Sequence, residues 1–550
     1  MNTKIIKIDP AELAGANAIL NEGANAFLSE GADALLREAA DVLRGGGLVA
    51  FPTETVYGLG ASVYDEAAMR SIYAVKGRPD DNPIIVHIDG ADRLDELAEN
   101  VSPGVYALAR RFWPGPLTMV LQKRAGLPGY ITSGLDTIAL RAPSHPVAAA
   151  LIKAAGAPIA APSANISGKP SPTIAAHVVN DLYGKIDMII DAGPATIGLE
   201  STVLDMTQTP AVLLRPGGVP FDDIAAVIGA NNIVRRRPAG KTARRPGSDA
   251  DAESPRSPGV KYKHYAPNAP MLLYKGNLEN ITNFIKLYME DQSNTAAYSG
   301  ILASRELITS LDNALRLHSD HFKVLSLGGA DETETAAKRF YGSLREFDRR
   351  RVEKIYCEYI RAAGIGDALS DRMIRAAGGS LIDADEPAVL FVCTGNTCRS
   401  AIAEALFNDE INKLLNAGEG REAPEAQPSP RCPRAVSAGL MAGGGTTASI
   451  EAVSALRLHN IDLSRHRSQQ LAPKHVQRAG IILTMTEAHK NEIIRRFPPA
   501  AARVFTLAGF MEGGGDIDDP FGRGPHAYQL CANRLRKLVI PLARKLTNLT

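Results

Sequence analysis

The chain has 550 residues, enough for several domains that each bury a hydrophobic core of their own. Its hydrophobic content of 45% and charged content of 22% are ordinary for a globular protein in water. The formal net charge of +1 argues against a chain dedicated to nucleic acid, because such a chain carries an excess of positive charge.

The N-terminal residues lack the long apolar core of a signal peptide, and no run of residues reaches the length of a membrane span. Five cysteines, an odd number without metal-ligand spacing, indicate a reducing compartment. We therefore expect a cytoplasmic protein without a membrane partner.

The first predicted elements are a helix and a strand that leads into a polar loop. Leu36, Ala39 and Leu43 fall on one helical face, three glycines end the helix, and residues 48–51 indicate a strand. Hydroxyl residues follow the strand, and a basic loop at residues 76–83 precedes a further apolar strand. Since α/β folds place their sites at strand ends, we predict a binding site here.

Similar clusters of hydroxyl, amide or arginine side chains beside apolar strands recur at residues 113–118, 137–141, 162–168, 200–203 and 214–217. Turn chemistry explains any one cluster, because Ser, Asn, Gly and Pro are turn residues. Their repetition favours a site instead. The residues before Lys169 lack the spacing of a Walker A motif, so any nucleotide is held in another way.

Taken together, these segments resemble the threonylcarbamoyl-AMP synthase family over about residues 30–235. The resemblance implies that L-threonine, bicarbonate and ATP condense into threonylcarbamoyladenylate and pyrophosphate, for tRNA threonylcarbamoyladenosine modification by downstream transferase machinery. It implies threonine contacts from Thr55, His87, Arg141, Ser163 and Ser201. It implies ATP contacts from Lys76, Arg78, Asn82, Thr137, Asn165, Thr173 and Arg215.

No covalent nucleophile is evident in this part of the chain. Catalysis would come mainly from orientation, which contributes about 7–11 kcal/mol, and from neutralisation of the polyphosphate. We expect Mg²⁺ to arrive with ATP, no metal ligand from protein side chains, and no prosthetic group.

Residues 236–267 have the composition of a linker or lid. The arginine run at its start could touch RNA, but a solvated charged face is the simpler interpretation. Residues 257–267 resemble the linker of the longer, two-domain synthases, which implies that Tyr265 contacts ATP. An aromatic anchor of the linker is the alternative. From residue 268 to 382, apolar strands alternate with helices and predict a Rossmann-like accessory α/β domain without catalytic residues, which positions the lid.

A second site is predicted where the apolar run at residues 389–392 ends at Cys393 and an amphipathic helix follows. A turn from strand to helix points backbone N–H groups and the helix dipole into one concavity, which suits a phosphate dianion and favours a thiolate. Arg399 can fork onto two phosphate oxygens, and the acidic stretch at residues 516–522 offers a general acid. A buried structural cysteine is the alternative.

The Cys-x5-Arg-Ser sequence with a distant Asp-Pro resembles the low-molecular-weight protein tyrosine phosphatases over residues 388–550. The resemblance implies a flavodoxin-like parallel α/β domain, Cys393 as nucleophile, Arg399 as phosphate clamp and Asp519 as acid. It assigns support of the loop to Thr394, Gly395, Asn396, Thr397, Cys398 and Ser400, with Cys398 able to shield Cys393 as a disulfide. Gly480 stands where this family usually has an acidic residue.

Within this family, the loop most resembles that of the protein arginine phosphatases, which carry Thr at the position of Thr397. Tyrosine phosphatases usually carry a larger aliphatic residue there. Protein phosphoarginine and phosphotyrosine both stay open as substrates.

The sequence therefore predicts an α/β multidomain, bifunctional enzyme. Its domains are a twisted open α/β synthase domain at residues 1–235, the linker or lid at 236–267, the accessory domain at 268–382 and the phosphatase domain at 388–550. Two other interpretations are a carboxyl-terminal module that only binds or regulates through phospho-residues, and an amino-terminal RNA-binding module. Asp519 counts against the first, and the lack of aromatic stacking platforms counts against the second.

Overall fold

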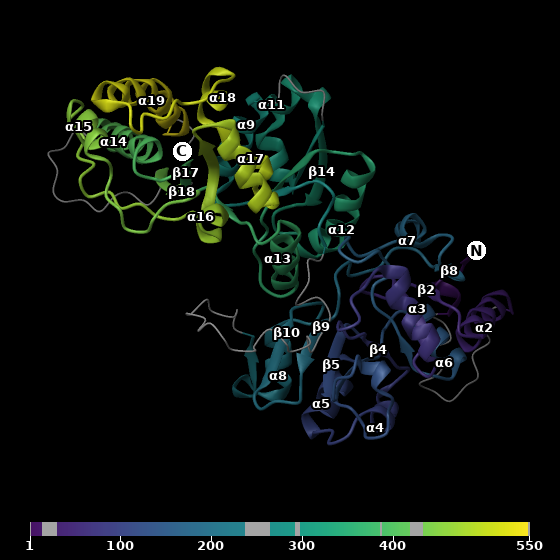
Figure 1. The fold of residues 1–550 in the computed structure, drawn as a ribbon. Coiled ribbons are helices and arrows are strands. Elements are labelled where there is room, and N and C mark those ends of the chain that lie inside the picture. The colour runs from purple at the N-terminus through teal and green to yellow at the C-terminus, as the bar shows by residue number, and fades with distance from the viewer. Residues whose placement is uncertain are drawn as a thin grey trace. The chain divides into compact units, whose positions relative to one another are not determined.

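The computed structural model describes residues 2–13, 30–236, 265–291, 298–385, 388–418 and 433–547. Most of the linker predicted at 236–267 lies outside these residues. The chain forms two compact units. The first unit contains residues 1–268, 331–349 and 360–376, and the second contains 269–330, 350–359 and 377–550. The accessory segment thus contributes two helices to the first unit and its strands to the second (Figure 1). The predicted α/β fold class is confirmed.

The first unit is built on a mixed sheet with the strand order β1-β8-β2-β3-β7-β4-β6-β5-β9-β10-β11 in the described residues. The strands are β1 (Lys4–Lys7), β2 (Val49–Phe51), β3 (Gly58–Ser62), β4 (Val86–His87), β5 (Leu117–Gln122), β6 (Thr137–Arg141), β7 (Ile159–Ala160), β8 (Met188–Asp191), β9 (Thr202–Asp205), β10 (Ala211–Arg215) and β11 (Ile233–Arg235). Alternate residues of β2 enter different cores, since Val49 and Phe51 pack in one cluster and Ala50 in another. The sheet therefore separates two hydrophobic layers.

Helices cover this sheet, and their ends follow from local sequence. They are α2 (Glu30–Arg44), α3 (Glu66–Lys76), α4 (Leu94–Leu97), α5 (Pro103–Phe112), α6 (Pro146–Ala155), α7 (Ala175–Leu182), α8 (Phe221–Ile228), α12 (Thr333–Arg349) and α13 (Ile365–Ala376). Asp65 caps α3 by accepting a hydrogen bond from the Ala68 N–H at 2.9 Å. Gly77 ends α3 in the left-handed conformation, with φ of 59°. The turn directs the chain at Arg78 back towards the sheet.

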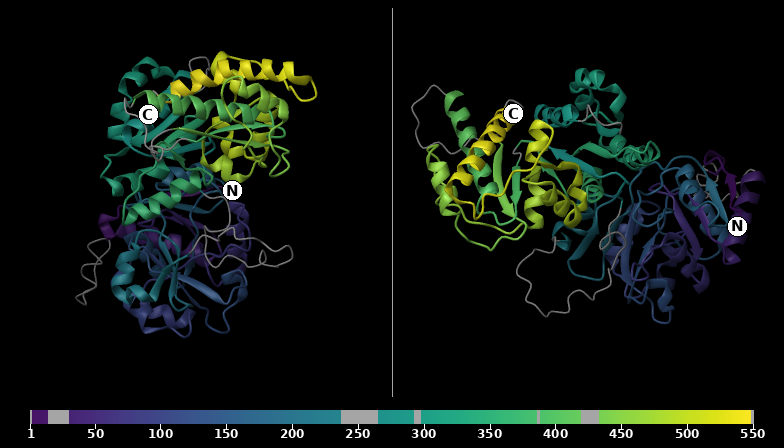
Figure 2. Two further views of the ribbon diagram at one scale, coloured as in Figure 1. Left: turned by 90° about the vertical axis from the view of Figure 1, so that its left-hand side faces the viewer. Right: turned by 45° about the horizontal axis from the view of Figure 1, so that its top comes forward.

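The second unit contains two parallel sheets (Figure 2). The accessory sheet has the order β14-β13-β15-β12-β16. Its elements are β12 (Met271–Lys275), α9 (Leu278–Asp291), β13 (Ser299–Ser304), α10 (Arg305–Ser310), α11 (Asp312–Leu317), β14 (Phe322–Gly328), β15 (Lys354–Glu358) and β16 (Ile382–Asp383). Strands and helices alternate along this segment as the sequence predicted, and apolar residues of the strands are buried in the core.

The other sheet has the order β18-β17-β19-β20. Its elements are β17 (Ala388–Cys393), α14 (Arg399–Gly418), β18 (Arg434–Gly439), α15 (Ile450–Arg457), α16 (Pro473–Arg478), β19 (Ala479–Thr484), α17 (Glu487–Arg496), the 3₁₀ turn η6 (Pro498–Arg503), β20 (Val504–Thr506), α18 (Leu507–Glu512) and α19 (Gly524–Thr547). Cys393 ends the central strand β17 at the carboxyl edge of the sheet, where α/β folds place their sites. Among the described residues, no helix is both long and apolar enough to cross a bilayer.

Candidate active sites

A cavity in the first unit brings together most of the predicted substrate residues. All five predicted threonine contacts line it: Thr55, His87, Arg141, Ser163 and Ser201. Four of the predicted ATP contacts line it as well: Arg78, Asn165, Arg215 and Tyr265. These side chains come from strand ends and loops that are far apart in sequence, and the sheet assembles them. We call this the hydroxyl-rich cavity.

Arg141 is held in the hydroxyl-rich cavity by a buried ion pair. Its Nη2 donates to Glu54 Oε1 at 2.6 Å, and its Nε donates to the Gly115 carbonyl at 3.3 Å. The other oxygen of Glu54 accepts from the Ser144 N–H at 3.2 Å. Since both members of a buried ion pair are fixed by further hydrogen bonds, the guanidinium has a defined orientation. Arg141 can therefore present its planar fork to a small carboxylate.

His87 at the end of β4 is a neutral imidazole. Burial and the charge of Arg141 lower the pKa of His87 to about 3. Its Nδ1 is buried without a hydrogen-bond partner in the described part of the chain. A buried polar atom without a hydrogen-bond partner indicates a position where a ligand atom can bind. Beside it, the hydroxyls of Thr53 and Thr55 lie 2.8 Å apart, and that of Ser201 lies 2.8 Å from the hydroxyl of Thr118.

Two buried guanidiniums give the hydroxyl-rich cavity its positive charge. Arg78 donates to the carbonyls of Asn82 at 3.1 Å and Pro83 at 2.8 Å. Arg215 at the end of β10 donates to the Ser201 carbonyl at 3.0 Å and to its hydroxyl at 3.2 Å. Burial lowers the pKa of Arg78 to about 10, and the charge of Arg215 acts in the same direction, so Arg78 is still cationic at neutral pH. Two cations kept out of water in one cavity suit a polyanionic ligand.

The other predicted ATP contacts, Lys76, Asn82, Thr137 and Thr173, are not among the described residues that line the cavity. Lys76 is buried, and its ammonium donates to the carbonyls of Ser163 and Asn165. Burial lowers the pKa of Lys76. Lys76 therefore fixes the loop that carries two lining residues. Asn82 has a buried side-chain amide whose N and O find no hydrogen-bond partner among the described residues.

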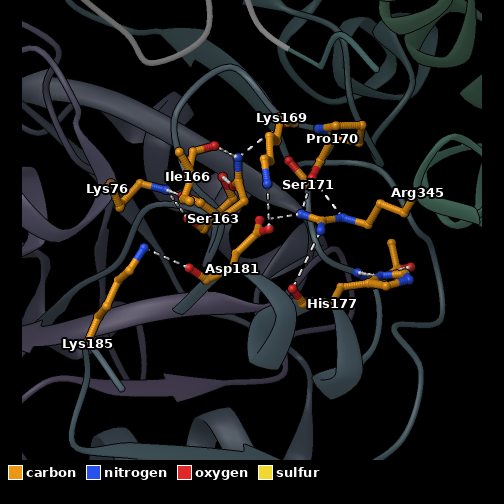
Figure 3. A network of polar contacts seen from close by, with 12 residues as sticks. Lys76, Ser163, Ile166, Lys169, Pro170, Ser171, His177, Asp181, Lys185 and Arg345 are labelled. Atoms are coloured by element: carbon orange, nitrogen blue, oxygen red, sulfur yellow. Dashed lines mark hydrogen bonds and ion pairs between the residues drawn. The ribbon is translucent and has the colours of Figure 1, made fainter. Parts of the chain in front are cut away.

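The same loop is held from the other side by a residue that the sequence did not single out for a role (Figure 3). Arg345 on α12 donates to the Pro170 carbonyl at 3.0 Å and to Asp181 at 2.9 Å. Asp181 near the end of α7 also accepts from Lys169, at 3.2 Å. Burial alone raises the pKa of Asp181, but hydrogen bonding and charge from Arg345 outweigh it and lower the pKa. The accessory helix α12 thus shapes the wall of the hydroxyl-rich cavity.

Glu200 joins both accessory helices to this cavity. Its carboxylate accepts from Arg372 Nε at 2.8 Å, from the Tyr341 hydroxyl at 3.1 and 3.0 Å, and from the Ser171 hydroxyl at 2.6 Å. Burial raises the pKa of Glu200, but the charges of Arg372 and Arg215 with the Ser171 hydrogen bond outweigh it and lower the pKa to about 2. Glu200 is therefore a fully ionised, fully paired carboxylate.

Tyr265 is positioned by the same two helices. Its ring stacks on Tyr341 with centroids 5.5 Å apart and an interplanar angle of 29°, and the guanidinium of Arg372 lies 5.2 Å from its centroid. The next N–H, of Ala266, donates to the Gly168 carbonyl at 3.0 Å. The sequence did not indicate a role at this site for Tyr341 or Arg372, because the residues around each form only the pattern of an amphipathic helix.

The loop after β17 in the second unit has the geometry of an anion cradle around a thiol. Cys393 Sγ lies 3.0 Å from the Ser400 hydroxyl, and the Asn396 N–H donates to it at 3.3 Å. Asn396 has a left-handed φ of 56°, and its side-chain amide donates to Ser400 at 3.0 Å and to Ser437 at 2.7 Å. These bonds fix the conformation of the turn that leads into the N-terminus of α14. The loop can therefore bind a phosphate against the sulfur.

Arg399 and Asp519 meet beside this loop. Arg399 Nη2 lies 2.5 Å from Asp519 Oδ2, and Nη1 donates to the Ile517 carbonyl at 3.0 Å. Arg399 is 5% exposed whereas the side chain of Asp519 is 48% exposed, so the acid lies at the mouth of the site. The structure thus brings together the three residues predicted as nucleophile, clamp and acid.

The other residues of the loop contact side chains from elsewhere in the second unit or from the loop itself. Thr394 Oγ1 lies 2.9 Å from Nε2 of His489 on α17, a residue that the sequence did not single out. Cys398 Sγ lies 3.2 Å from the Tyr528 hydroxyl and 3.6 Å from Thr397 Oγ1. Gly395 has room around its Cα, with Thr397 Oγ1 3.6 Å from an added Cβ.

Comparison with known proteins finds matches to three parts of the chain. Residues 41–217 match the family described as "Telomere recombination", residues 219–378 match "Threonylcarbamoyl-AMP synthase, C-terminal domain", and residues 388–549 match "Low molecular weight phosphotyrosine protein phosphatase". A threonylcarbamoyl-AMP synthase of Pyrococcus abyssi is 43% identical over 62% of this chain and 93% of its own. A protein-arginine-phosphatase of Geobacillus stearothermophilus is 40% identical over 29% of this chain and 95% of its own.

A solved structure agrees with the first of these likenesses. The crystal structure of P. abyssi Sua5 complexed with L-threonine is 40% identical, has a TM-score of 0.58, and covers 69% of this chain and 99% of its own. Both likenesses extend over nearly the whole length of the relative. The chain is therefore an enzyme that belongs to the threonylcarbamoyl-AMP synthase family and, through its carboxyl-terminal residues, to the low molecular weight phosphotyrosine protein phosphatase family.

Proposed function

We propose that the hydroxyl-rich cavity condenses L-threonine, bicarbonate and ATP into threonylcarbamoyladenylate and pyrophosphate, and that the product supplies downstream tRNA-modifying transferase machinery. The observation that carries this proposal is the pairing of two buried guanidiniums, Arg78 and Arg215, with a hydroxyl-lined wall in one cavity. The threonine complex of the P. abyssi relative supports the amino acid as one ligand.

In this mechanism Arg141 binds the threonine carboxylate, while the hydroxyls of Thr55 and Ser201 orient the amino acid. The threonine nitrogen takes up bicarbonate carbon with loss of water, and a carbamate oxygen then attacks the α-phosphorus of ATP. The bond from that phosphorus to the bridging oxygen breaks, and pyrophosphate leaves with its electron pair. Arg78 and Arg215 neutralise the charge on the triphosphate, and Tyr265 covers the nucleotide.

Mg²⁺ would neutralise further charge on the phosphates when it is bound with ATP. The described residues contain no group of three or more His, Cys, Asp and Glu side chains that could hold a metal. Glu200 lines the cavity, but Arg372, Tyr341 and Ser171 already occupy its oxygens. In this proposal the nucleotide phosphates hold the cation.

The synthase proposal is tested by the dependence of pyrophosphate release on both co-substrates. Pyrophosphate should form from ATP when threonine and bicarbonate are both present, and omission of either should stop it. Release that is independent of threonine would reduce the site to an ATP hydrolase and contradict the proposal.

For the second site, protein phosphoarginine or phosphotyrosine is hydrolysed through a cysteinyl-phosphate. Cys393 Sγ attacks phosphorus, the bond to the leaving nitrogen or oxygen breaks, and Asp519 gives that atom its proton. Water then attacks the cysteinyl-phosphate, Asp519 takes a proton from it, and inorganic phosphate leaves. Arg399 and the loop N–H groups hold the phosphate oxygens in both steps.

Thr397 and the arginine phosphatase relative favour phosphoarginine as the substrate. A module that only binds phospho-residues is the second candidate, but the contact of Asp519 with Arg399 at the site supports turnover. Phosphoarginine and phosphotyrosine peptides offered side by side to the purified chain test both points. Phosphate release from the phosphoarginine peptide is expected to be faster, and no release from either would leave only a binding module.

A further inference from the structure

Gly480 lies against residues of the accessory sheet. It is the second residue of β19, a strand in which every residue is buried. A Cβ at this position would lie 3.2 Å from two ring atoms of Phe284 on α9 and 3.5 Å from a methyl group of Ile382 on β16. Phe284 is 3% exposed and Ile382 is fully buried. The aromatic ring therefore occupies the space that any larger residue at position 480 would need.

A polar contact lies beside this apolar one. Arg503, at the end of η6, is only 1% exposed. Its Nη1 donates to the hydroxyl of Ser380, just before β16, at 2.5 Å, and its Nη2 donates to the Val476 carbonyl at 2.9 Å. These two acceptors offset part of the cost of burying the guanidinium. Ser380 supplies one of these acceptors from the accessory segment.

A third close approach continues the same surface. Gly378 has a left-handed φ of 64°, and a Cβ there would lie 3.1 Å from the ring of Pro499. The buried apolar residues around Phe284 and Ile382 also form one continuous core cluster with Ile481 of β19. The two sheets of the second unit are thus packed together without an intervening polar layer at this point.

We propose that the accessory sheet is the fixed docking partner of the phosphatase sheet in this chain, and that Gly480 is the residue that permits it. The docking surface consists of Gly480, Pro499 and Arg503 on the phosphatase side and Phe284, Gly378, Ser380 and Ile382 on the accessory side. This inference concerns neither catalytic site and holds whichever substrates those sites take.

The position of the surface leaves the phosphatase loop accessible. Gly480 lies at the amino end of β19, and Arg503 directly precedes β20. Because β17, β19 and β20 are parallel, these residues lie at the opposite end of the sheet from Cys393. The accessory sheet can therefore hold the phosphatase domain without covering its site. Replacement of Gly480 by an acidic residue would place a carboxylate against Phe284, where it has no water.

The test cuts the chain between the two sheets and asks whether the fragments stay together. A protease recognition sequence is placed between Asp385 and Ala388 of the full chain, and the cleaved protein is run on a size-exclusion column. Wild-type fragments should co-elute, and fragments of the Gly480→Asp variant should separate while hydrolysis of an aryl phosphate stays within about two-fold. Gly444→Asp is the matched control, since nothing lies within 4 Å of its added Cβ, and its fragments should co-elute.

A second variant keeps the proposal testable if Gly480→Asp fails to fold. Phe284→Glu leaves the phosphatase fragment unaltered and places a charge in the same contact, so it should also separate the fragments. Wild-type fragments that separate, or Phe284→Glu fragments that co-elute as the wild type does, would overturn the proposal.

Discussion

Arg399 Nη2 lies 2.5 Å from Asp519 Oδ2, so the predicted phosphate clamp is paired with the predicted general acid. The pair also lies beside the loop that presents Cys393, whose sulfur accepts from the Asn396 N–H. A bound phosphate has to replace Asp519 as the acceptor of the hydrogen bond from Arg399 Nη2. Phosphate binding would thereby release the carboxylate, which is half exposed, towards the leaving group.

Asp519→Asn should separate binding from turnover. The amide cannot protonate the leaving group, so kcat for an aryl phosphate should fall about 10²–10⁴-fold. Competitive inhibition by inorganic phosphate should be retained or strengthened, because Arg399 loses its anionic partner. Steady-state kinetics with phosphate as inhibitor measure both quantities. A kcat within ten-fold of the wild type would remove Asp519 from the role of acid.

Tyr341→Phe should weaken ATP binding to the synthase site. The change deletes the hydroxyl that donates to both oxygens of Glu200 but keeps the ring on which Tyr265 stacks. A hydrogen bond to a charged group contributes about 1.5–3 kcal/mol, which sets the upper limit of the effect, so the KM for ATP should rise by up to about ten-fold.

The KM for threonine should change little in the Tyr341→Phe variant, and this split distinguishes positioning of Tyr265 from general destabilisation. Tyr183→Phe is the control, because Tyr183 is half exposed and its hydroxyl bonds only Asn2 among the contacts described. Equal rises in both KM values would argue that the hydroxyl acts through overall folding.

Thr397→Ile tests the substrate preference of the phosphatase site. A larger aliphatic side chain removes the hydroxyl and is expected to raise activity on phosphotyrosine peptides relative to phosphoarginine peptides. The measured quantity is the ratio of kcat/KM values for two peptides that differ only in the modified residue. An unchanged ratio would show that this position does not set the preference.

Chelation should affect the two activities differently. If Mg²⁺ comes to the synthase site with ATP, excess EDTA should abolish pyrophosphate release, and added Mg²⁺ should restore it. Hydrolysis of an aryl phosphate should be unchanged, because Arg399 and backbone N–H groups hold the phosphate there. Loss of aryl phosphate hydrolysis with EDTA would point to a metal that this account does not include.

The sequence predicted best what is contiguous along the chain. The phosphatase loop is a single stretch from Cys393 to Ser400, so its chemistry could be predicted from the sequence without knowledge of the fold. Glu200 and Arg372 are 172 residues apart, and neither has a local pattern that points to the other. Gly480 likewise had no explanation until packing placed Phe284 against it. Periodicity and motif spacing do not encode such long-range pairing of ordinary residue types, either in the hydroxyl-rich cavity or between the two sheets of the second unit.

The central claim is that one chain carries two separate anion sites, one around Cys393 and one around Arg78. It is tested most directly by assaying both activities in Cys393→Ser and Arg78→Ala variants of the full chain. Cys393→Ser should abolish aryl phosphate hydrolysis with pyrophosphate release within two-fold of the wild type, and Arg78→Ala should do the reverse. Loss of both activities in either variant would contradict the account.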